Sequence, residues 1–299
     1  MDGTLDELVT EAQSRNASDL DLRSTRELVG LMNNEDATVP AVVAAASEQI
    51  AAAVDAIVDR LAEGGRLIYV GAGSSGRLAA LDAAECEATF AAEPGQIVAL
   101  LAGAQLTSPL DQEAAEDDAR AGARDLERLG VSSTDAVVGV SASGRTPYVL
   151  GAMEAARDVD ALTVGVVSVP DAELGRLVDH EITIVVGPEV VAGSTRLKAG
   201  TAQKLVLNTI STVSMIRLGR TFGNLMVDVQ ATNEKLRARA KRIVQLATGS
   251  TAPEAERALT EAGGNAKVAI VSLLTGLDSD SARLQLESAN DNVREALRR

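Results

Sequence analysis

The spacing of hydrophobic and polar residues changes along the chain and divides it into three parts. Up to about residue 64 the pattern is helical: Ser24 and Glu27 form a capping-box pattern, and Pro40 stands where an early helical turn would begin. Short runs of β-branched and aliphatic residues then alternate with helical stretches. From about Arg196 onward the strand pattern stops, and helices alone are expected.

The middle part predicts a parallel sheet. Apolar strands that alternate with helices are typical of a sheet covered on both faces. The expected strands are Arg66 to Gly71, Gln96 to Leu101, Asp135 to Val140, Leu162 to Val169 and Glu181 to Val186. The expected helices lie near 75–86, 111–128, 147–157 and 171–178.

The last part predicts helices over 197–219 and 232–247, followed by an Ala-rich helical unit over 252–298. The expected fold class is therefore α/β, a parallel sheet flanked by helices, with helices before it and a helical unit after it. The expected division is an N-terminal helical segment over 1–64, an α/β domain over 65–230 and a C-terminal helical unit over 231–299.

Composition and charge narrow the possible partners. The chain holds 28 Lys and Arg against 43 Asp and Glu, a formal net charge of −15. Such a surface repels phosphate backbones and anionic headgroups, so neither nucleic acid nor an acidic membrane is expected as the main partner. An anionic metabolite can still bind where backbone N–H groups and local cations outweigh the global field.

The single cysteine and the single histidine exclude further kinds of site. Cys86 alone cannot form an internal disulfide or a cysteine-rich metal site, and His180 alone cannot form a His-pair zinc site. No apolar run is long enough to span a bilayer, since Glu48 and Asp55 interrupt the Ala- and Val-rich residues 37–58. We therefore expect a cytoplasmic protein.

A glycine-rich loop follows the first expected strand. Residues 71–76 read Gly-Ala-Gly-Ser-Ser-Gly and open a helix, whose N-terminus presents unpaired N–H groups to an anion. The same letters fit a dinucleotide-binding pattern, which also expects a carboxylate at the end of the next strand. None stands there before Asp111. Gly73 and the adjacent hydroxyls of Ser74 and Ser75 favour a terminal phosphate instead.

A second loop, Ser-Ala-Ser-Gly-Arg-Thr-Pro at 141–147, follows the expected strand 135–140 and precedes another helix, with Pro147 suited to its first turn. One serine-rich loop is usually an ordinary turn or cap. Two of them, both at the carboxyl ends of parallel strands, lie where ligands bind in open α/β sheets. The candidate phosphate-binding residues here are Ser141, Ser143, Arg145 and Thr146, together with the backbone amides around Gly144.

These loops resemble the two signatures of sugar isomerase (SIS) domains, which bind phosphosugars. Longer blocks resemble one family in particular, the N-acetylmuramic acid 6-phosphate etherases. The matching blocks are residues 35–40, 82–86, 143–148, 187–190, 193–204, 223–229 and 232–236. The resemblance runs from about Thr10 to the C-terminus.

The resemblance implies an SIS-type fold and cleavage of the lactyl ether at C3 of the sugar, in cell-wall amino sugar catabolism. The products would be N-acetylglucosamine 6-phosphate and D-lactate, with no metal or redox cofactor. It also implies a homodimer whose sites lie near the subunit interface. By the same resemblance the catalytic pair is Glu85, as acid toward the leaving oxygen, and Glu116, as the base. Without the resemblance, Glu116 is better interpreted as part of a solvated acidic helix face.

The chemistry needs two proton-transfer groups, because the C2 proton must leave and the lactyl oxygen must be protonated. Small apolar neighbours are expected to raise the pKa of Glu85, and repulsion from Glu113, Asp117 and Asp118 that of Glu116. An unbroken helix from Ser75 would carry Glu85 about 15 Å along its axis, beyond the phosphate-to-C2 reach of one sugar. We therefore expect either a break in the helix before Glu85 or a Glu85 that serves the neighbouring subunit.

Further candidates follow the last strand. Glu189 stands in Gly187-Pro188-Glu189-Val190, and related sugar-phosphate isomerases carry a functional glutamate in the comparable signature. Ser194 and Lys198 lie where the next helix opens. Lys198 is either a charge partner for the substrate or the partner of a nearby carboxylate.

Two alternative functions remain open. An aldose–ketose sugar-phosphate isomerase would use the same loops but would need no acid aimed at a C3 leaving group. A non-catalytic sugar-phosphate sensor would keep the loops without needing the carboxylates. The presence of both Glu85 and Glu116 favours the etherase.

Overall fold

The computed structural model describes residues 9–298 except 15, 16, 18, 107 and 230–233. The chain forms two compact units, one made of 1–84 and 95–211 and the other of 85–94 and 212–299. The N-terminal helices thus belong to the same unit as the sheet. The short segment 85–94 belongs to the helical unit, which the ranges expected from the sequence do not foresee.

A five-stranded parallel sheet forms the centre of the first unit, as the strand pattern predicts. Its order is β2-β1-β3-β4-β5, and every neighbouring pair is parallel. The strands are β1 (Leu67–Gly71), β2 (Ile97–Leu101), β3 (Ala136–Val140), β4 (Leu162–Val167) and β5 (His180–Thr183). All residues of β1, β3 and β4 are buried, which explains their continuous apolar sequence. The last two strands end earlier than expected, at residues 167 and 183 rather than 169 and 186.

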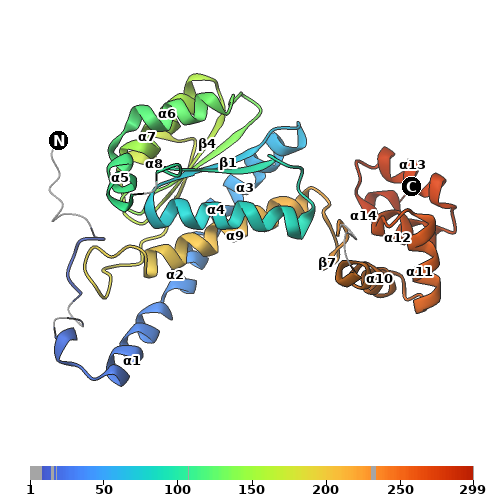
Figure 1. The fold of residues 1–299 in the computed structure, drawn as a ribbon, viewed down its shortest axis with the longest axis horizontal. Coiled ribbons are helices and arrows are strands. Elements are labelled where there is room, and N and C mark those ends of the chain that lie inside the picture. The colour runs from blue at the N-terminus through green and yellow to red at the C-terminus, as the bar shows by residue number, and fades with distance from the viewer. Residues whose placement is uncertain (1–8, 15–16, 18, 107, 230–233, 299) are drawn as a thin grey trace. The chain divides into compact units, whose positions relative to one another are not determined.

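Helices cover both faces of this sheet. Figure 1 shows α6 and α7 on one face and α4 and α9 on the other. Before and between the strands lie η2 (Leu20–Leu22), α1 (Thr25–Asp36), α2 (Val39–Ala45), α3 (Ser47–Ala62), α4 (Gly73–Phe90), α5 (Pro109–Ala114), η3 (Ala115–Asp117), α6 (Ala119–Arg128), α7 (Pro147–Asp158) and α8 (Glu173–Leu177), and α9 (Lys198–Arg217) follows the sheet. The core between the sheet and α6, α7 and α8 includes Val70, Leu126, Val137, Val149, Met153 and Leu174.

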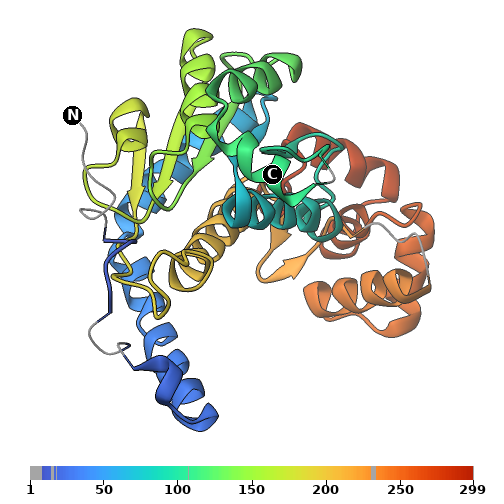
Figure 2. The same ribbon diagram turned by 60° about the vertical axis from the view of Figure 1, so that its left-hand side comes forward.

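The local signals of helix ends behave as expected. Ser24 caps α1 in a capping box with Glu27, Pro40 lies in the first turn of α2, and Pro147 begins α7. Helix α1 has no buried residue, and Figure 2 shows it projecting from the body of its unit. This helix therefore gains little stability from packing within one chain.

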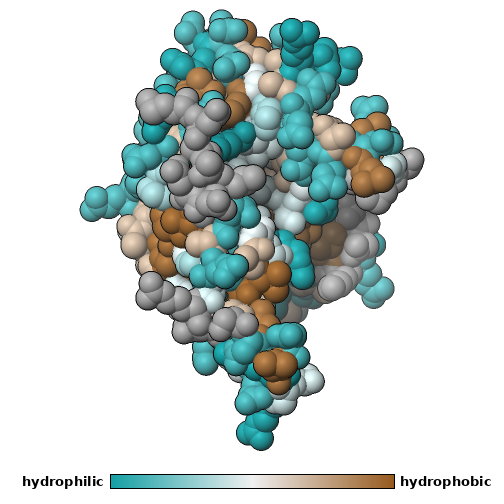
Figure 3. All heavy atoms as spheres, turned by 90° about the vertical axis from the view of Figure 1, so that its left-hand side faces the viewer, coloured by the Kyte–Doolittle hydropathy of each residue, from teal (hydrophilic) through white to brown (hydrophobic). Residues whose placement is uncertain are grey.

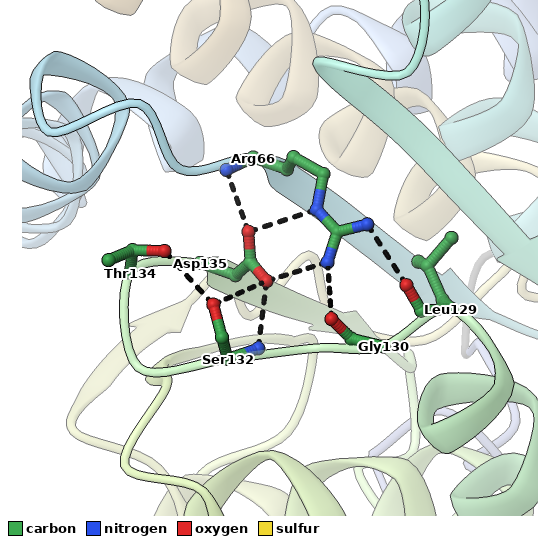
Figure 4. Close-up of polar contacts among 6 residues, drawn as sticks. All are labelled: Arg66, Leu129, Gly130, Ser132, Thr134 and Asp135. Carbon is green, nitrogen blue, oxygen red and sulfur yellow. Dashed lines mark hydrogen bonds and ion pairs between the residues drawn. The ribbon is translucent and has the colours of Figure 1, made fainter.

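An ion pair between the partly exposed Arg66 and the buried Asp135 joins the amino ends of β1 and β3. The Arg66 guanidinium donates to both carboxylate oxygens of Asp135 and to the carbonyls of Leu129 and Gly130, as Figure 4 shows. Burial alone would raise the pKa of Asp135, but the hydrogen bonds from Arg66 and from the Ser132 backbone outweigh it and leave that pKa lowered. The pair lies at the edge of the sheet opposite the carboxyl ends and stabilises the register of the two central strands.

Helices α4 and α9 pack in parallel through a polar seam. The carboxylate of Asp82, which is buried, accepts hydrogen bonds from Tyr69 on β1 and from Asn208 and Ser211 on α9. Nearer the N-termini of both helices, the Ser75 hydroxyl of α4 donates to the side chain of Gln203 on α9 over 2.9 Å. Both helices therefore begin at the carboxyl edge of the sheet in a fixed register.

The second unit is mainly helical. Its elements after α9 are β6 (Thr221–Phe222), β7 (Leu225–Met226), α10 (Glu234–Thr248), α11 (Ala252–Glu261), α12 (Ala266–Thr275), α13 (Ser279–Ser288) and α14 (Val293–Ala296). The antiparallel pair β6–β7 corrects the expectation that no strand follows Arg196. Lys267 is 1% exposed and lies 2.8 Å from both Asp228 and Asp291. Burial raises the pKa of Asp228 even though Lys267 lowers it.

Among the described helices, no single one is long and apolar enough to cross a membrane. The bent pair made of 25–45 and 47–62 has the length and composition for it. Within that pair, the apolar face of α3 is buried against β3, β4 and β5.

Candidate phosphosugar site

The strand order places the two serine-rich loops side by side. Strands β1 and β3 are neighbours, and Gly71 at the end of β1 pairs with Val140 at the end of β3. The chain turns to β2 on one side of β1 and to β4 and β5 beyond β3, so this is the point where the strand order reverses. Open α/β sheets bind ligands at such a point. The prediction that both loops lie at carboxyl ends of parallel strands is confirmed.

The first loop depends on glycine at two places. Gly73 has φ +51°, a left-handed conformation that L side chains rarely adopt. A Cβ on Gly71 would lie 2.8 Å from the backbone of Gly76, so the turn closes only without that atom. Ser74 accepts a hydrogen bond from Arg77 over 3.3 Å, and Ser75 donates to Gln203. The loop thus leads directly into the first turn of α4, whose N–H groups face the carboxyl edge of the sheet.

The second loop is organised by its own hydroxyls. The buried Ser141 lies 2.8 Å from the Thr146 hydroxyl and accepts the N–H of Gly144 over 3.1 Å. Ser143 accepts the N–H of Arg145, whose side chain is exposed. Gly144 has φ +64°, and a Cβ there would come within 2.5 Å of the Ala172 side chain. These residues form a compact polar turn at the N-terminus of α7.

Glu116 lies against the first loop. It belongs to the short 3-10 helix η3, where its side chain is partly buried. An atom at the Cβ position of Gly73 would be 2.8 Å from Glu116 Oε1, so the carboxylate occupies the space that glycine leaves open. The structure therefore brings Gly73 and Glu116 together, although 42 residues separate them in sequence. Glu116, which the sequence pattern alone assigns to a solvated acidic helix face, is in contact with the loop instead.

The surroundings of Glu116 raise its pKa. Burial is the largest cause, followed by repulsion from Glu113 and Asp117, while Arg77 lowers the pKa. The direction agrees with the sequence-based expectation. That expectation named repulsion alone, whereas desolvation is the largest cause of the raised pKa, and Asp118 is not among the causes. Asp118 instead caps α6 by accepting the N–H of Ala121. A carboxylate with a raised pKa is a stronger base than an ordinary one, which suits it to taking up a proton from a substrate.

Glu85 lies elsewhere on the same helix. Helix α4 runs without interruption from Gly73 to Phe90, so the expected break before Glu85 does not exist. The side chain of Glu85 is exposed, and its small apolar neighbours do not desolvate it in the single chain. With a rise of about 1.5 Å per residue, Glu85 lies about 15 Å along the axis from Ser75. The remaining sequence-based expectation is a role toward a neighbouring subunit.

Glu189 and Lys198 have structural partners. Glu189 is buried, and both of its carboxylate oxygens accept backbone N–H groups at the start of α9, from Lys198 and Ala199. The Lys198 ammonium is also buried and lies 2.6 Å from the carboxylate of Glu35. Of the two interpretations of Lys198, the structure shows the ion pair with a carboxylate. Ser194 lies partly buried in the turn before α9, where its N–H donates to Val191.

Two features of the site escape sequence reasoning. Gln203 on α9 accepts a hydrogen bond from Ser75. Arg77 donates to Ser74, and its positive charge lowers the pKa of Glu116. The one sequence signal that Gln203 is buried is its spacing of four and eight residues from Leu207 and Ser211. This spacing places the three residues on one face of α9, and all three are buried. Figure 3 shows the face at which the strands' carboxyl ends point, where hydrophilic side chains predominate between smaller hydrophobic patches.

The sheet order, the two loops and the helices that begin beside them define an SIS-type α/β protein. Residues 49–157 match the family model described as "Glucokinase regulatory protein N-terminal SIS domain". The fold also matches a phosphoheptose isomerase from Francisella tularensis, with a TM-score of 0.50 and 18% identity, over 65% of this chain and 100% of that chain.

Curated relatives match almost the whole chain. The N-acetylmuramic acid 6-phosphate etherase of Rubrobacter xylanophilus is 58% identical over 297 residues, which are 99% of this chain and 98% of that protein. The N-acetylmuramic acid 6-phosphate etherase of Streptomyces avermitilis is 55% identical over 293 residues, which are 98% of this chain and 94% of that protein. The chain belongs to the N-acetylmuramic acid 6-phosphate etherase family.

Proposed function

We propose that this protein cleaves the lactyl ether at C3 of N-acetylmuramic acid 6-phosphate and releases N-acetylglucosamine 6-phosphate and D-lactate. The observation that carries the proposal is the contact of Glu116 with Gly73, which brings a carboxyl group of raised pKa to the phosphate loop of a chain from this family. Because a charged phosphosugar does not cross a bilayer unaided, we place the reaction in the cytoplasm.

The two loops bind the phosphate. Backbone N–H groups at the start of α4 and hydroxyls of Ser74 and Ser75 meet it from one side, and the turn 141–146 meets it from the other. Helix N-termini stabilise anions in this position because their N–H groups have no partner within the helix. Arg145, exposed at the rim, adds a cation to a chain whose net charge is otherwise negative. Glu189 supports the site indirectly by capping α9, and Lys198 by its ion pair with Glu35.

The reaction is an elimination followed by addition of water. In the ring-opened sugar the C2 proton is acidic because it is α to the C1 aldehyde. Glu116 takes this proton, the C3–O bond breaks, and the departing lactyl oxygen receives a proton from an acid. Water then adds at C3 of the conjugated aldehyde, and a proton returns to C2, so the second product is a simple C3 alcohol. The raised pKa of Glu116 suits a group that takes and returns a proton.

Glu85 is the acid, and it acts in the site of a second copy of the chain. Its distance along the continuous helix α4 argues against a role at the loop that begins the same helix. Its exposed side chain is available to a neighbouring molecule. Helix α1, which has no buried residue and carries Val29 at 55% exposure, offers a surface for the same association. The functional unit is therefore a homodimer.

An isomerase or a sensor explains less of the site. An isomerase would need the C2 base but no acid for a C3 leaving group, and a sensor would need neither. A sensor leaves unexplained why a carboxylate is desolvated against the phosphate loop, an arrangement that costs stability. An isomerase explains that carboxylate as its C2 base but gives no role to a second carboxyl group as an acid for the C3 oxygen.

The test is D-lactate release from N-acetylmuramic acid 6-phosphate by the purified protein, beside Glu116→Gln and Glu85→Gln. Loss of a proton-transfer group typically costs about 10²- to 10⁴-fold in rate. We expect both variants to lose activity in this range while they retain binding of N-acetylglucosamine 6-phosphate. If the wild-type protein binds this sugar phosphate but releases no lactate, the etherase proposal is wrong and the sensor function is favoured instead.

Subunit mixing tests the position of Glu85. Each of the Glu85→Gln and Glu116→Gln proteins is expected to keep only residual activity alone, but a mixed dimer contains one site with both carboxylates if Glu85 crosses between subunits. We expect activity to return when the two variants are unfolded and refolded together. A mixture that stays inactive, while dimers form, would exclude the role of Glu85 in a neighbouring site.

A further inference from the structure

Gln203 has an unusual combination of burial and pairing. Its side chain is 1% exposed, on the face of α9 that packs against α4. The Ser75 hydroxyl donates to Gln203 Oε1 over 2.9 Å. Among the described residues, no acceptor lies within hydrogen-bond reach of Gln203 Nε2, although this atom is buried. A buried N–H donor without an acceptor loses its hydration and gains nothing in return.

This pairing directs the single proton of Ser75 away from the loop. A serine hydroxyl has one donor and two acceptor sites. While the Ser75 hydroxyl donates its proton to Gln203 Oε1 in this hydrogen bond, Ser75 can offer only oxygen lone pairs to an approaching ligand. Lone pairs repel a phosphate oxygen, so in this state Ser75 opposes the anion that the first loop otherwise attracts.

A half-turn of the amide reverses the direction. Rotation about the last side-chain bond exchanges Oε1 and Nε2 while the shape of the side chain stays the same. Nε2 then donates to Ser75 Oγ, and the hydroxyl proton becomes available to a phosphate oxygen. The atom left without a partner is then a carbonyl oxygen, which is a less severe loss than an orphaned N–H. Binding of an anion in the loop favours this second state.

We propose that Gln203 is a positioning residue for phosphate binding, which sets the direction of the Ser75 hydroxyl and turns over when the phosphosugar binds. The surrounding packing supports this role. Four and eight residues further along α9, Leu207 is buried and Ser211 is bonded to Asp82, so the amide cannot retreat from Ser75 without moving the helix. The inference rests on the proposed phosphate site but not on the chemistry at C3.

The test is a double-mutant cycle of Gln203→Met and Ser75→Ala. Methionine has similar length but cannot donate to Ser75. Two quantities are measured: the Kd for N-acetylglucosamine 6-phosphate by calorimetry, and kcat and KM for lactate release. We expect Gln203→Met to raise Kd and KM about 3- to 10-fold, the usual effect of losing one neutral hydrogen bond, with kcat changed less than about twofold. In the Ser75→Ala background the same substitution should add less than about twofold, because its effect passes through Ser75.

Two further variants make the result decisive. Gln203→Glu keeps the shape, but its ionised carboxylate can only accept, so it should weaken binding more than Gln203→Met. Its charge also repels the phosphate directly, and that part of the effect persists in the Ser75→Ala background. The part that disappears in the Ser75→Ala background measures the action through Ser75, and this comparison carries the test if Gln203→Met does not fold. Gln245→Met, the same replacement on α10, should leave Kd unchanged. Equal effects of Gln203→Met with and without Ser75, or no effect on Kd, would overturn the inference. Since Kd is measured without turnover, an absence of lactate release would count against the proposed chemistry and not against Gln203.

Discussion

The substitution Gly73→Ala tests the contact between the phosphate loop and Glu116. The new Cβ would lie 2.8 Å from Glu116 Oε1, whereas ordinary contacts of a Cβ begin near 3.4 Å. The carboxylate must therefore move by about 0.6 Å or more, which its flexible side chain can do at little cost in stability. A misplacement of about 1 Å in a catalytic group can cost about 10²-fold in rate. We expect kcat/KM to fall about 10- to 100-fold.

The backbone contributes separately to this substitution. Gly73 has φ +51°, so any L residue there costs about 1–2 kcal/mol of folding free energy. Gly130→Ala is a matched control, because Gly130 has φ +65° and no heavy atom within 4 Å of its would-be Cβ. Both variants should lose similar unfolding free energy in urea.

Lactate release separates the two effects. The assay is kcat/KM for N-acetylmuramic acid 6-phosphate at a temperature where wild type and both variants are folded. Gly130→Ala should match the wild type, and Gly73→Ala should be slower by the factor given above. If Gly73→Ala were as active as Gly130→Ala, the position of Glu116 against the loop would have no part in the reaction.

Three further predictions concern charged groups. The pKa of Glu116 is raised on folding, so the protonated side chain favours the folded state below its unfolded pKa, and this advantage is lost as pH rises through the folded pKa. Ionised Glu116 therefore destabilises the fold at high pH. In urea denaturation, Glu116→Gln should be more stable than wild type at pH 8, and the difference should vanish near pH 4. Arg66→Met should cost about 3 kcal/mol because it leaves Asp135 buried and unpaired, while Arg128→Met, in a surface pair, should cost below about 1 kcal/mol. Since the pKa of Asp135 is lowered on folding, wild type should lose this advantage over Arg66→Met as pH falls through that pKa. Lys267→Met should cost about 3–5 kcal/mol by calorimetry, and equal stability to wild type would contradict the structural role of this buried lysine.

Local features of the chain were predictable because they depend on neighbouring residues. The strand segments follow from continuous apolar runs, and the helix starts at Ser24 and Pro147 follow from capping chemistry. The turn at Gly73 follows from the conformational freedom of glycine. Even the parallel sheet was predictable, since strands that alternate with helices have few other ways to pair. The long resemblance to one family likewise rests on residues contiguous in sequence.

What the tertiary structure alone decided is which distant groups meet. Strand order placed the ends of β1 and β3 side by side, and so joined two loops that the sequence presents separately. The packing of η3 against the first loop turned Glu116 from an acidic surface residue into a desolvated neighbour of Gly73. Packing also gave Lys198 a carboxylate partner and placed Gln203 against Ser75. Hydrophobic periodicity determines which face of an element is buried, but the partner that a polar group finds depends on the register of whole elements, which no local pattern encodes.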